Sequence, residues 1–356
     1  MIKSEWQFTT WIRRHSTLAI LVVPLVLIAL GVILFGGALL ERITIVLFIN
    51  LVLVVGLQVF MGNSGVMSFA HIGFMGIAAY ASILFSMTPR MKGIALPNLY
   101  PVLMQVQLPF ILALLVGATI ATLVAAVVGF PLMRLSGAAP IATFALLVII
   151  HRVLINWDEV TNGARTIFGI ERFTTLWVSA AWGILFVVLA YWFRETSLGL
   201  KLRASREDEH AAASIGINIV IVRWVAFILS AFMTAVAGAL WAHFIISFSP
   251  LSFYLTRTFL IVTMLIIGGT GSVSGAVVGT VVVTAIFEGL RGIENAINLA
   301  GFLPFTVSGL TEVFLSTALI VILILRPAGI TGGQEFHWPR KQIQSEGSPD
   351  PADHGT

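Results

Sequence analysis

Long apolar runs with few charges constrain the folding of this chain more than any other feature of its sequence. Several runs are about 17–25 residues long, enough for a helix to cross a hydrocarbon core of ~30 Å. They show no alternation of period two, so they predict helices rather than the strands of a barrel. Hydrophobic residues make up 58% of the 356, whereas soluble domains have roughly 45–50% apolar residues. The sequence therefore predicts an all-α fold, a polytopic transmembrane helical bundle.

The runs predict about ten spans, of which the third is interrupted by glycines and the eighth is short, as in broken or re-entrant helices. They lie at 17–35, 43–61, 68–87, 109–133, 138–155, 176–193, 224–246, 257–268, 274–290 and 308–326. With the N-terminus inside, twelve Lys and Arg residues fall in inner loops and seven in outer ones. By the positive-inside rule, both termini are then predicted to be cytoplasmic.

The two ends of the chain differ from the region between them. Residues 1–16 are predicted to be a cytoplasmic N-terminus before an uncleaved first span, because the following apolar run is longer than that of a signal peptide. Residues 17–330 form the predicted transmembrane domain. Residues 331–356 contain glycine, proline and charges without a periodic apolar face, which predicts a disordered cytoplasmic tail.

Signatures of enzymes and cofactor sites are missing from the sequence. There is no cysteine, no G-x-x-x-x-G-K-[ST] phosphate loop and no H-E-x-x-H motif, and the seven histidines do not cluster. The net charge of +4 comes from scattered loop residues and gives no reason to expect nucleic acid. We therefore expect no bound cofactor or metal and no enzymatic activity. If the protein pumps, its energy comes from another subunit.

A charged loop at 194–223 separates two long apolar runs and is the strongest positive signal. Its acidic residues suit the positive end of a helix dipole, and its alanines let another surface approach closely. Gly216 suits the end of such a helix because glycine adopts positive φ. From the residues alone, a partner-binding helix and a solvated loop that only marks the cytoplasmic side are equally good interpretations. The candidate coupling residues are Arg206, Glu207, Asp208, Glu209, Ala211, Ala212 and Gly216.

Glycine and serine interrupt two apolar runs, one near the start of each half of the chain. Such breaks are typical of discontinuous helices whose freed backbone lines a translocation path. Close helix packing through small residues is the alternative, and we favour it for Gly73, Gly76, Gly275 and Gly279. His71 fits either a path-lining residue or a neutral core histidine. The candidate path residues at the breaks are Asn63, Ser64, Gly65, Ser68, His71, Gly269, Gly271 and Ser272.

The charged loop resembles the EAA loop of ABC importer permeases, in the version found in membrane subunits of branched-chain amino acid ABC transporters. The matching residues are Arg206-Glu207-Asp208-Glu209-x-Ala211-Ala212-x-x-x-Gly216-Ile217-Asn218. Further similar blocks follow in family order over roughly 45–333. They include Ser68-Phe69-Ala70-His71, Thr161-Asn162-Gly163, Ile267-Gly268-Gly269-x-Gly271-Ser272 and Arg326-Pro327-Ala328-Gly329-Ile330. Four positions depart from the family pattern: Ala70, Asn162, His210 and Ala213.

The resemblance implies a type II-like ABC importer permease in a bacterial inner membrane, with 17–330 as its permease domain. It implies alternating access driven by two cytoplasmic ATP-binding subunits that hold the ATP and Mg²⁺, a second permease subunit, and a periplasmic or surface-tethered substrate-binding protein. The expected cargo is a branched-chain amino acid. Thr161, Asn162 and Gly163 join the candidate path as part of the family's middle outer loop.

Two alternatives stay open at this point. Members with the same signature also resemble carriers of urea, short amides and aromatic acids. A secondary transporter driven by an ion gradient would need a carboxylate within the membrane, and Glu288 and Glu312 are the candidates for it.

Overall fold

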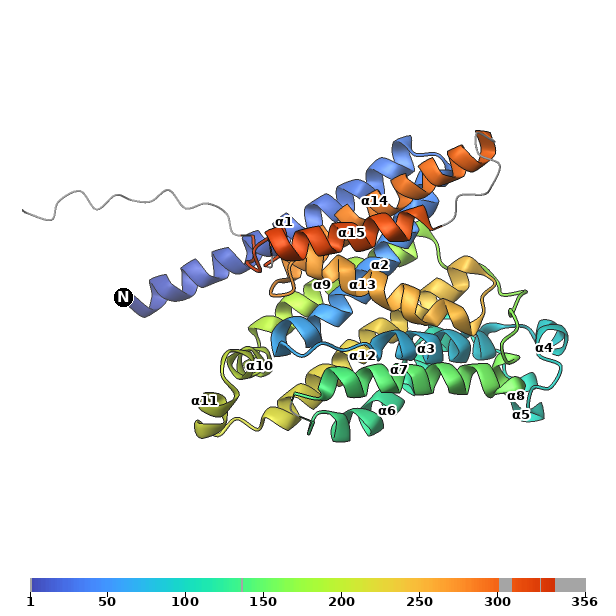
Figure 1. Cartoon of the computed structure of the whole chain (residues 1–356), viewed down its shortest axis with the longest axis horizontal. Helices are drawn as coiled ribbons and strands as arrows, with labels where there is room; N and C mark the ends of the chain where they lie inside the picture. The colour runs from blue at the N-terminus through green and yellow to red at the C-terminus, as the bar shows by residue number, and fades with distance from the viewer. Residues whose placement is uncertain (1, 136, 301–308, 327, 337–356) are drawn as a thin grey trace, which may run out of the picture.

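The computed structural model describes residues 2–135, 137–300, 309–326 and 328–336. Within these ranges the regular elements are helices, and one isolated antiparallel β-bridge pairs Ile167 with Phe248. This confirms the predicted all-α helical bundle (Figure 1). The helices are α1 (Ile2–Phe35), α2 (Ala38–Ser64), α3 (His71–Ser86), α4 (Pro89–Ala95), α5 (Pro101–Met104), α6 (Phe110–Leu132), α7 (Ala139–Asn156), α8 (Asp158–Thr161), α9 (Leu176–Glu195), α10 (Ser197–Glu207), α11 (Glu209–Ser214), α12 (Ile219–Ile245), the 3₁₀ helix η1 (Pro250–Phe253), α13 (Leu255–Gly268), α14 (Val273–Ala300) and α15 (Leu310–Leu325).

Eight segments of the described chain are long and apolar enough to cross a membrane, where the sequence predicts about ten spans. The third predicted span, 68–87, shortens to the sixteen residues of α3 because Gly65 turns the chain at φ 72° and the next helix begins only at His71. The tenth also has sixteen residues, in α15. The eighth is longer than predicted, since η1 extends it to Pro250–Gly268.

Helix α2 lies in the middle of the bundle, with α9, α12 and α14 packed against it. From Thr44 to Ser64 it is buried almost throughout. Its sequence is apolar on every side, which is the pattern of a helix surrounded by other helices. The core therefore forms around α2.

Small residues bring the helices close together. A Cβ on Gly238 of α12 would lie 2.1 Å from the Met75 carbonyl oxygen of α3, and one on Gly279 of α14 would lie 2.0 Å from the Met264 carbonyl oxygen of α13. A Cβ on Gly275 would lie 2.2 Å from the Gly269 carbonyl oxygen. These approaches leave no room for a side chain, which confirms the packing interpretation for Gly275 and Gly279.

The segment 331–336, which the sequence places in a disordered tail, contacts the bundle. Thr331 donates its backbone N–H to the Gly268 carbonyl oxygen at 3.1 Å. The Glu335 carboxylate accepts from the backbone N–H groups of Val273 (2.8 Å) and Ser274 (2.9 Å) and pairs with Arg194. A carboxylate at a helix N-terminus is favourable, and here it fastens the segment to α14. The predicted tail from 337 onward lies outside the described residues.

Candidate functional site

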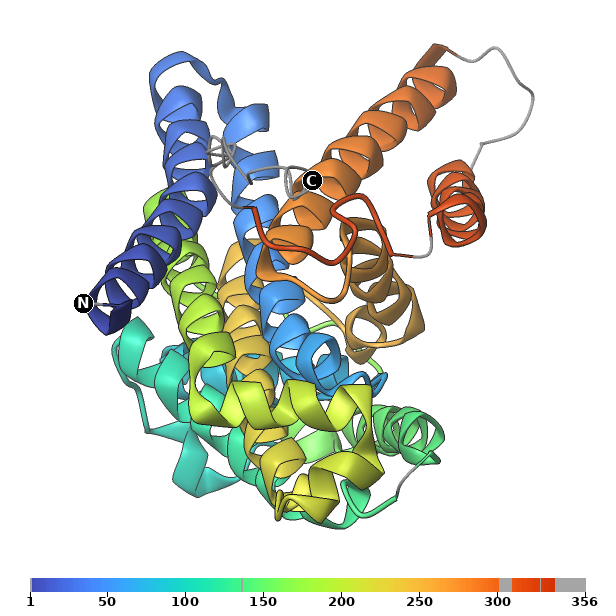
Figure 2. The same cartoon turned by 90° about the vertical axis from the view of Figure 1, so that its left-hand side faces the viewer.

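Two short helices at one end of the molecule, α10 and α11, form the segment that the charged loop predicts. Figure 2 shows them lying across the end of the bundle that faces the viewer. Asp208 separates them, because its extended backbone (φ −151°, ψ 114°) ends α10 and begins α11. Its carboxylate accepts a hydrogen bond from the Ala211 backbone N–H at 2.9 Å, the geometry of an N-cap. This hydrogen bond lowers the pKa of Asp208 and keeps the carboxylate ionised.

Gly216 follows the end of α11 with φ +83°, as predicted. Its backbone N–H donates to the Ala213 carbonyl oxygen at 3.0 Å. The Asn218 side chain then caps α12 by accepting from the Ile221 N–H at 3.2 Å. One glycine and two polar caps therefore define the path from α11 into α12, one of the helices packed against α2.

Two polar contacts attach this segment to the membrane helices. Arg206 of α10 donates from Nη1 to the Gly62 carbonyl oxygen of α2 at 2.5 Å. Glu209 of α11 forms an ion pair with Arg223 of α12, whose side chain is 6% exposed while that of Glu209 is 42% exposed. These contacts join α10 to α2 and α11 to α12.

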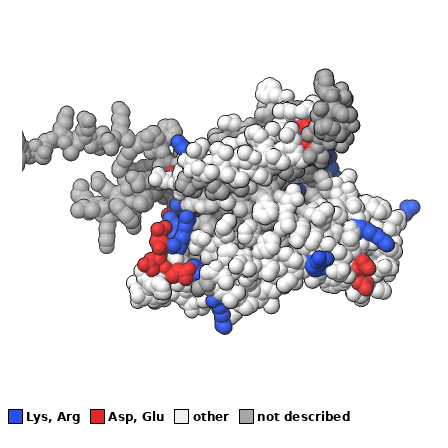
Figure 3. Space-filling view, in the orientation of Figure 1, with Lys and Arg blue, Asp and Glu red and all other residues white. Residues whose placement is uncertain are grey.

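The rest of the segment faces outward. Glu207, Asp208, Ala211 and Gly216 are exposed, whereas Ala212 is buried beneath them. In Figure 3 acidic side chains gather at the end of the molecule where Figure 1 places α10 and α11. The predicted coupling residues thus divide into an exposed acidic surface and a set that holds it to the bundle.

The two glycine breaks meet beside Arg206. A Cβ on Gly62 would lie 2.3 Å from the Thr270 carbonyl oxygen, and one on Gly65 would lie 2.9 Å from Cγ of Arg206. Gly269 (φ 117°) ends α13, Gly271 follows it, and the Ser272 hydroxyl caps α14 at the Gly275 N–H. These breaks lie at the end of the bundle where α10 and α11 lie.

The other candidate path residues are spread over separate places. Asn63 and Ser64 are buried in the last turn of α2, and Asn63 Nδ2 donates to the Val59 carbonyl oxygen at 3.0 Å. Ser68 and His71 border a cavity of only about 10 Å³, the room for one water molecule. His71 Nε2 lies 2.7 Å from the Ser230 hydroxyl, which donates to the Gly56 carbonyl oxygen at 2.6 Å.

The middle outer loop lies away from these residues. The Thr161 hydroxyl bonds to the carbonyl oxygens of Leu154 (2.6 Å) and Trp157 (2.7 Å). Asn162 and Gly163 follow with φ 60° and 63°, completing a tight turn after α8. The assignment of all these residues to one path stays a prediction.

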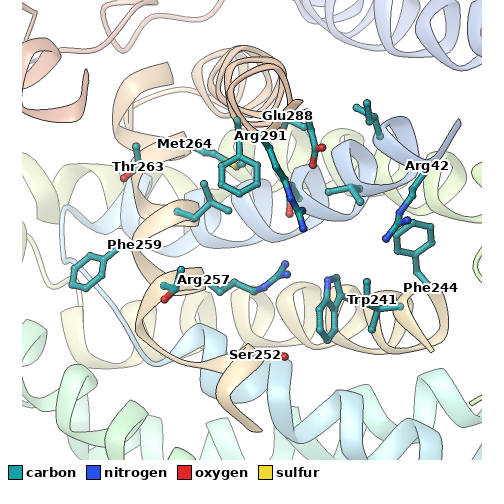
Figure 4. A pocket seen from close by; sticks show the side chains of 18 of the residues that line it. Arg42, Trp241, Phe244, Ser252, Arg257, Phe259, Thr263, Met264, Glu288 and Arg291 are labelled. Atoms are coloured by element: carbon teal, nitrogen blue, oxygen red, sulfur yellow. The ribbon is translucent and has the colours of Figure 1, made fainter. Parts of the chain in front are cut away.

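A large cavity of about 830 Å³ opens between α2, α12, α13 and α14. Its walls include Asn50, Trp241, Arg257, Glu288 and Arg291 (Figure 4). Arg42, at its mouth, lies twenty residues before Gly62 on α2, about 30 Å along the axis at 1.5 Å per residue. The cavity therefore lies toward the end of the bundle opposite the coupling segment.

Sequence reasoning missed this cavity. The signal that could have pointed to it is Arg257, a charged residue at the start of the apolar run 257–268. Of the two carboxylates considered for ion coupling, Glu288 lines the cavity and is half-buried. The side chain of Glu312 lies outside the described residues. In the described ranges, no three His, Asp or Glu side chains come together in a group that could hold a metal ion.

Comparison with known proteins shows the family to which this chain belongs. A family described as "Branched-chain amino acid transport system / permease component" matches residues 39–324. The high-affinity branched-chain amino acid transport system permease protein LivM of Salmonella typhimurium is 25% identical over 318 residues, covering 79% of this chain and 67% of LivM. LivH, a permease protein of the same system in Escherichia coli K12, is 25% identical over 306 residues, covering 79% of this chain and 90% of LivH.

A third relative transports a different class of cargo. The nucleoside ABC transporter permease protein NupC of Lactococcus lactis is 26% identical over 203 residues, covering 52% of this chain and 61% of NupC. No solved structure matches. Because the family match covers most of its length, this chain belongs to the branched-chain amino acid permeases, the membrane channel subunits of ABC importers.

Proposed function

We propose that this chain forms half of the translocation pathway of an importer for branched-chain amino acids, driven by separate ATP-binding subunits. The observation that carries the proposal is the exposed α10–α11 segment, attached to α2 through Arg206 and to α12 through Glu209. A surface that is free on one side and fastened to two core helices on the other suits the transmission of force. The relatives LivM and LivH support the cargo, since both are named for branched-chain amino acid transport.

The mechanism we propose is alternating access. Closure of the ATP-binding subunits displaces α10 and α11, and the two attachments carry that displacement into α2 and α12. Both helices also contribute walls to the cavity at the other end. Movement of α2 against α12 thereby changes the width of the cavity, which opens and closes one face of the pathway.

The proposed assembly has a defined orientation. The coupling segment and both termini face the cytoplasm, where two ATP-binding subunits hold the ATP and Mg²⁺. The cavity faces the outer side, where a substrate-binding protein delivers the cargo, and a second permease subunit completes the path. The basic residues of the inner loops support this orientation.

The test is reconstitution of the complete importer in vesicles, with ATP hydrolysis measured with and without loaded binding protein. Combined replacement of Glu209 and Gly216 by alanine is expected to abolish substrate stimulation while the assembly still purifies intact. A matched control is Lys201→Gln, an exposed charge on α10. Stimulation that survives the double replacement contradicts the coupling role. Uptake that proceeds without ATP and follows an ion gradient contradicts the importer itself.

Nucleosides are the second candidate cargo, because NupC is a relative of comparable identity. Nucleosides carry no charge, whereas amino acids carry a carboxylate and an ammonium group. Competition for uptake of labelled leucine by excess isoleucine, adenosine, urea or an aromatic acid separates these cargo classes. Competition by adenosine alone favours the nucleoside assignment.

A further inference from the structure

The large cavity has more positive than negative charge on its walls. Three arginines line it, Arg42, Arg257 and Arg291, and one acidic residue, Glu288. Over the described ranges, none of these four side chains forms an ion pair within 4.0 Å. Arg291 interacts electrostatically with Glu294 on the same helix, whereas Arg257 has no carboxylate within 4.0 Å among the described residues. A half-buried cation without a counter-ion is costly and marks a place where a ligand supplies the opposite charge.

Arg257 is the best placed of the three arginines. It is half-buried, whereas Arg42 and Arg291 are exposed at the mouth. Its guanidinium lies 4.6 Å from the centre of the Trp241 ring, a cation–π contact that fixes its position without neutralising it. Figure 4 shows it extending toward Trp241, with Arg291 and Glu288 reaching toward the same space from α14. A guanidinium held in this way leaves donors free for a bidentate carboxylate.

Two buried polar atoms on the same walls have no protein partner. They are Oδ1 of Asn50 and Oγ1 of Thr284, and their residues are 4% and 2% exposed. Each of these atoms has less than 1 Å² of accessible surface, so both lie beneath the cavity wall rather than open to a ligand in the cavity.

We propose that this cavity binds the charged head group of an α-amino acid. The arginines, with Arg257 foremost, receive the carboxylate, and the Glu288 carboxylate receives the ammonium. Leu260 and Met264 supply an apolar wall for an aliphatic side chain. This inference rests on the proposed import function and deepens it, since it assigns the substrate contacts to this cavity rather than to the glycine breaks.

The natural absence of cysteine allows a test that needs no transport. Ser252 lines the cavity and is half-buried, so Ser252→Cys places one thiol on its wall. The complete assembly in neutral phosphatidylcholine nanodiscs is treated with a negatively charged methanethiosulfonate. Modification of this chain is followed by mass spectrometry with L-leucine, L-leucinamide or adenosine present. The Arg257→Gln background is compared with Arg90→Gln, an exposed arginine outside the cavity.

L-Leucine is expected to slow modification at least about tenfold, and leucinamide and adenosine less than about twofold, because a charge-assisted bidentate contact is worth roughly that factor or more. Protection by leucine is lost with Arg257→Gln and kept with Arg90→Gln. Equal protection by leucinamide, protection that survives Arg257→Gln, or no protection at all overturns the proposal. So does protection by anionic phosphatidylglycerol without leucine, which assigns the arginines to a lipid phosphate. ATP-driven leucine uptake by the assembly is measured separately. If leucine protects the thiol but is not taken up, the import function is overturned and the binding site stands.

Discussion

The ion pair between Glu209 and Arg223 gives the sharpest quantitative prediction about coupling. The Arg223 side chain is 6% exposed and that of Glu209 is 42% exposed. Removal of one partner from a fully buried pair costs about 3–5 kcal/mol, and exposed pairs are worth about 0.2–1 kcal/mol. Because one partner is solvated and the other buried, we expect Glu209→Ala to weaken the attachment of α11 to α12 by about 2 kcal/mol.

That free energy converts into a measurable loss of coupling. A change of 1.4 kcal/mol is a tenfold change in an equilibrium constant, so about 2 kcal/mol raises the population of the detached segment by about 25-fold. The assay is a double-mutant cycle with Glu209→Ala, Arg223→Ala and both together, read by substrate-stimulated ATP hydrolysis of the reconstituted importer. Basal hydrolysis is expected to stay the same, because the proposed mechanism places the nucleotide on the ATP-binding subunits.

The same double-mutant cycle can refute the hypothesis that the Glu209–Arg223 pair couples the two helices. The two single variants are expected to be similarly impaired, and the double variant no worse than either, which gives a coupling energy of about 2 kcal/mol. The apolar pair Glu209→Met with Arg223→Met tests whether packing alone restores the attachment. Strictly additive effects, or full stimulation in either single variant, contradict the idea that this pair transmits force.

Three further predictions concern local structure. Gly216→Ala forces a side chain to φ +83°, which costs about 1–2 kcal/mol and speeds amide hydrogen exchange through α11, whereas Gly216→Asn has a smaller effect. Asp208→Ala removes the N-cap of α11 and speeds hydrogen exchange of the Ala211 amide, whereas Asp208→Asn preserves the cap. The hydrogen bond from the Ala211 amide lowers the pKa of Asp208. The stability that the charged cap contributes is therefore present above the unfolded-state pKa and is lost as pH falls through the folded-state pKa. Gly279→Ala meets the Met264 carbonyl oxygen and lowers the unfolding temperature of the purified assembly, whereas Gly93→Ala, with nothing within 4 Å, leaves it unchanged.

Much of this architecture follows from local sequence patterns. The apolar runs predict the helices of the bundle because each run is long and continuous. The charged loop predicts a short helix because its acidic residues suit the start of a helix and Gly216 suits its end. The span count is less predictable. The length of α3 depends on where this helix begins after the turn at Gly65. The eighth span is longer than predicted because η1 extends it back to Pro250.

The sites depend on contacts that sequence separation hides. Arg206 and Gly62 are 144 positions apart, and nothing in either segment predicts their hydrogen bond. The cavity likewise combines Asn50, Trp241, Arg257 and Glu288, which lie on four helices and form no motif. Glu335 was assigned to the tail because a short charged segment has no apolar periodicity, and its place at the start of α14 is a tertiary contact.

We propose that partner ATP-binding subunits bind α10 and α11 from the cytoplasm. Site-specific photo-crosslinking tests this contact most directly. Ser214→p-benzoylphenylalanine places the probe on the exposed end of α11. Irradiation of membranes containing the assembled importer is predicted to join this chain mainly to an ATP-binding subunit, with a yield that changes when ATP is trapped. A probe at Arg90, on α4, is predicted to give no such adduct. An adduct with the substrate-binding protein at position 214, or none with the ATP-binding subunits, would contradict the account.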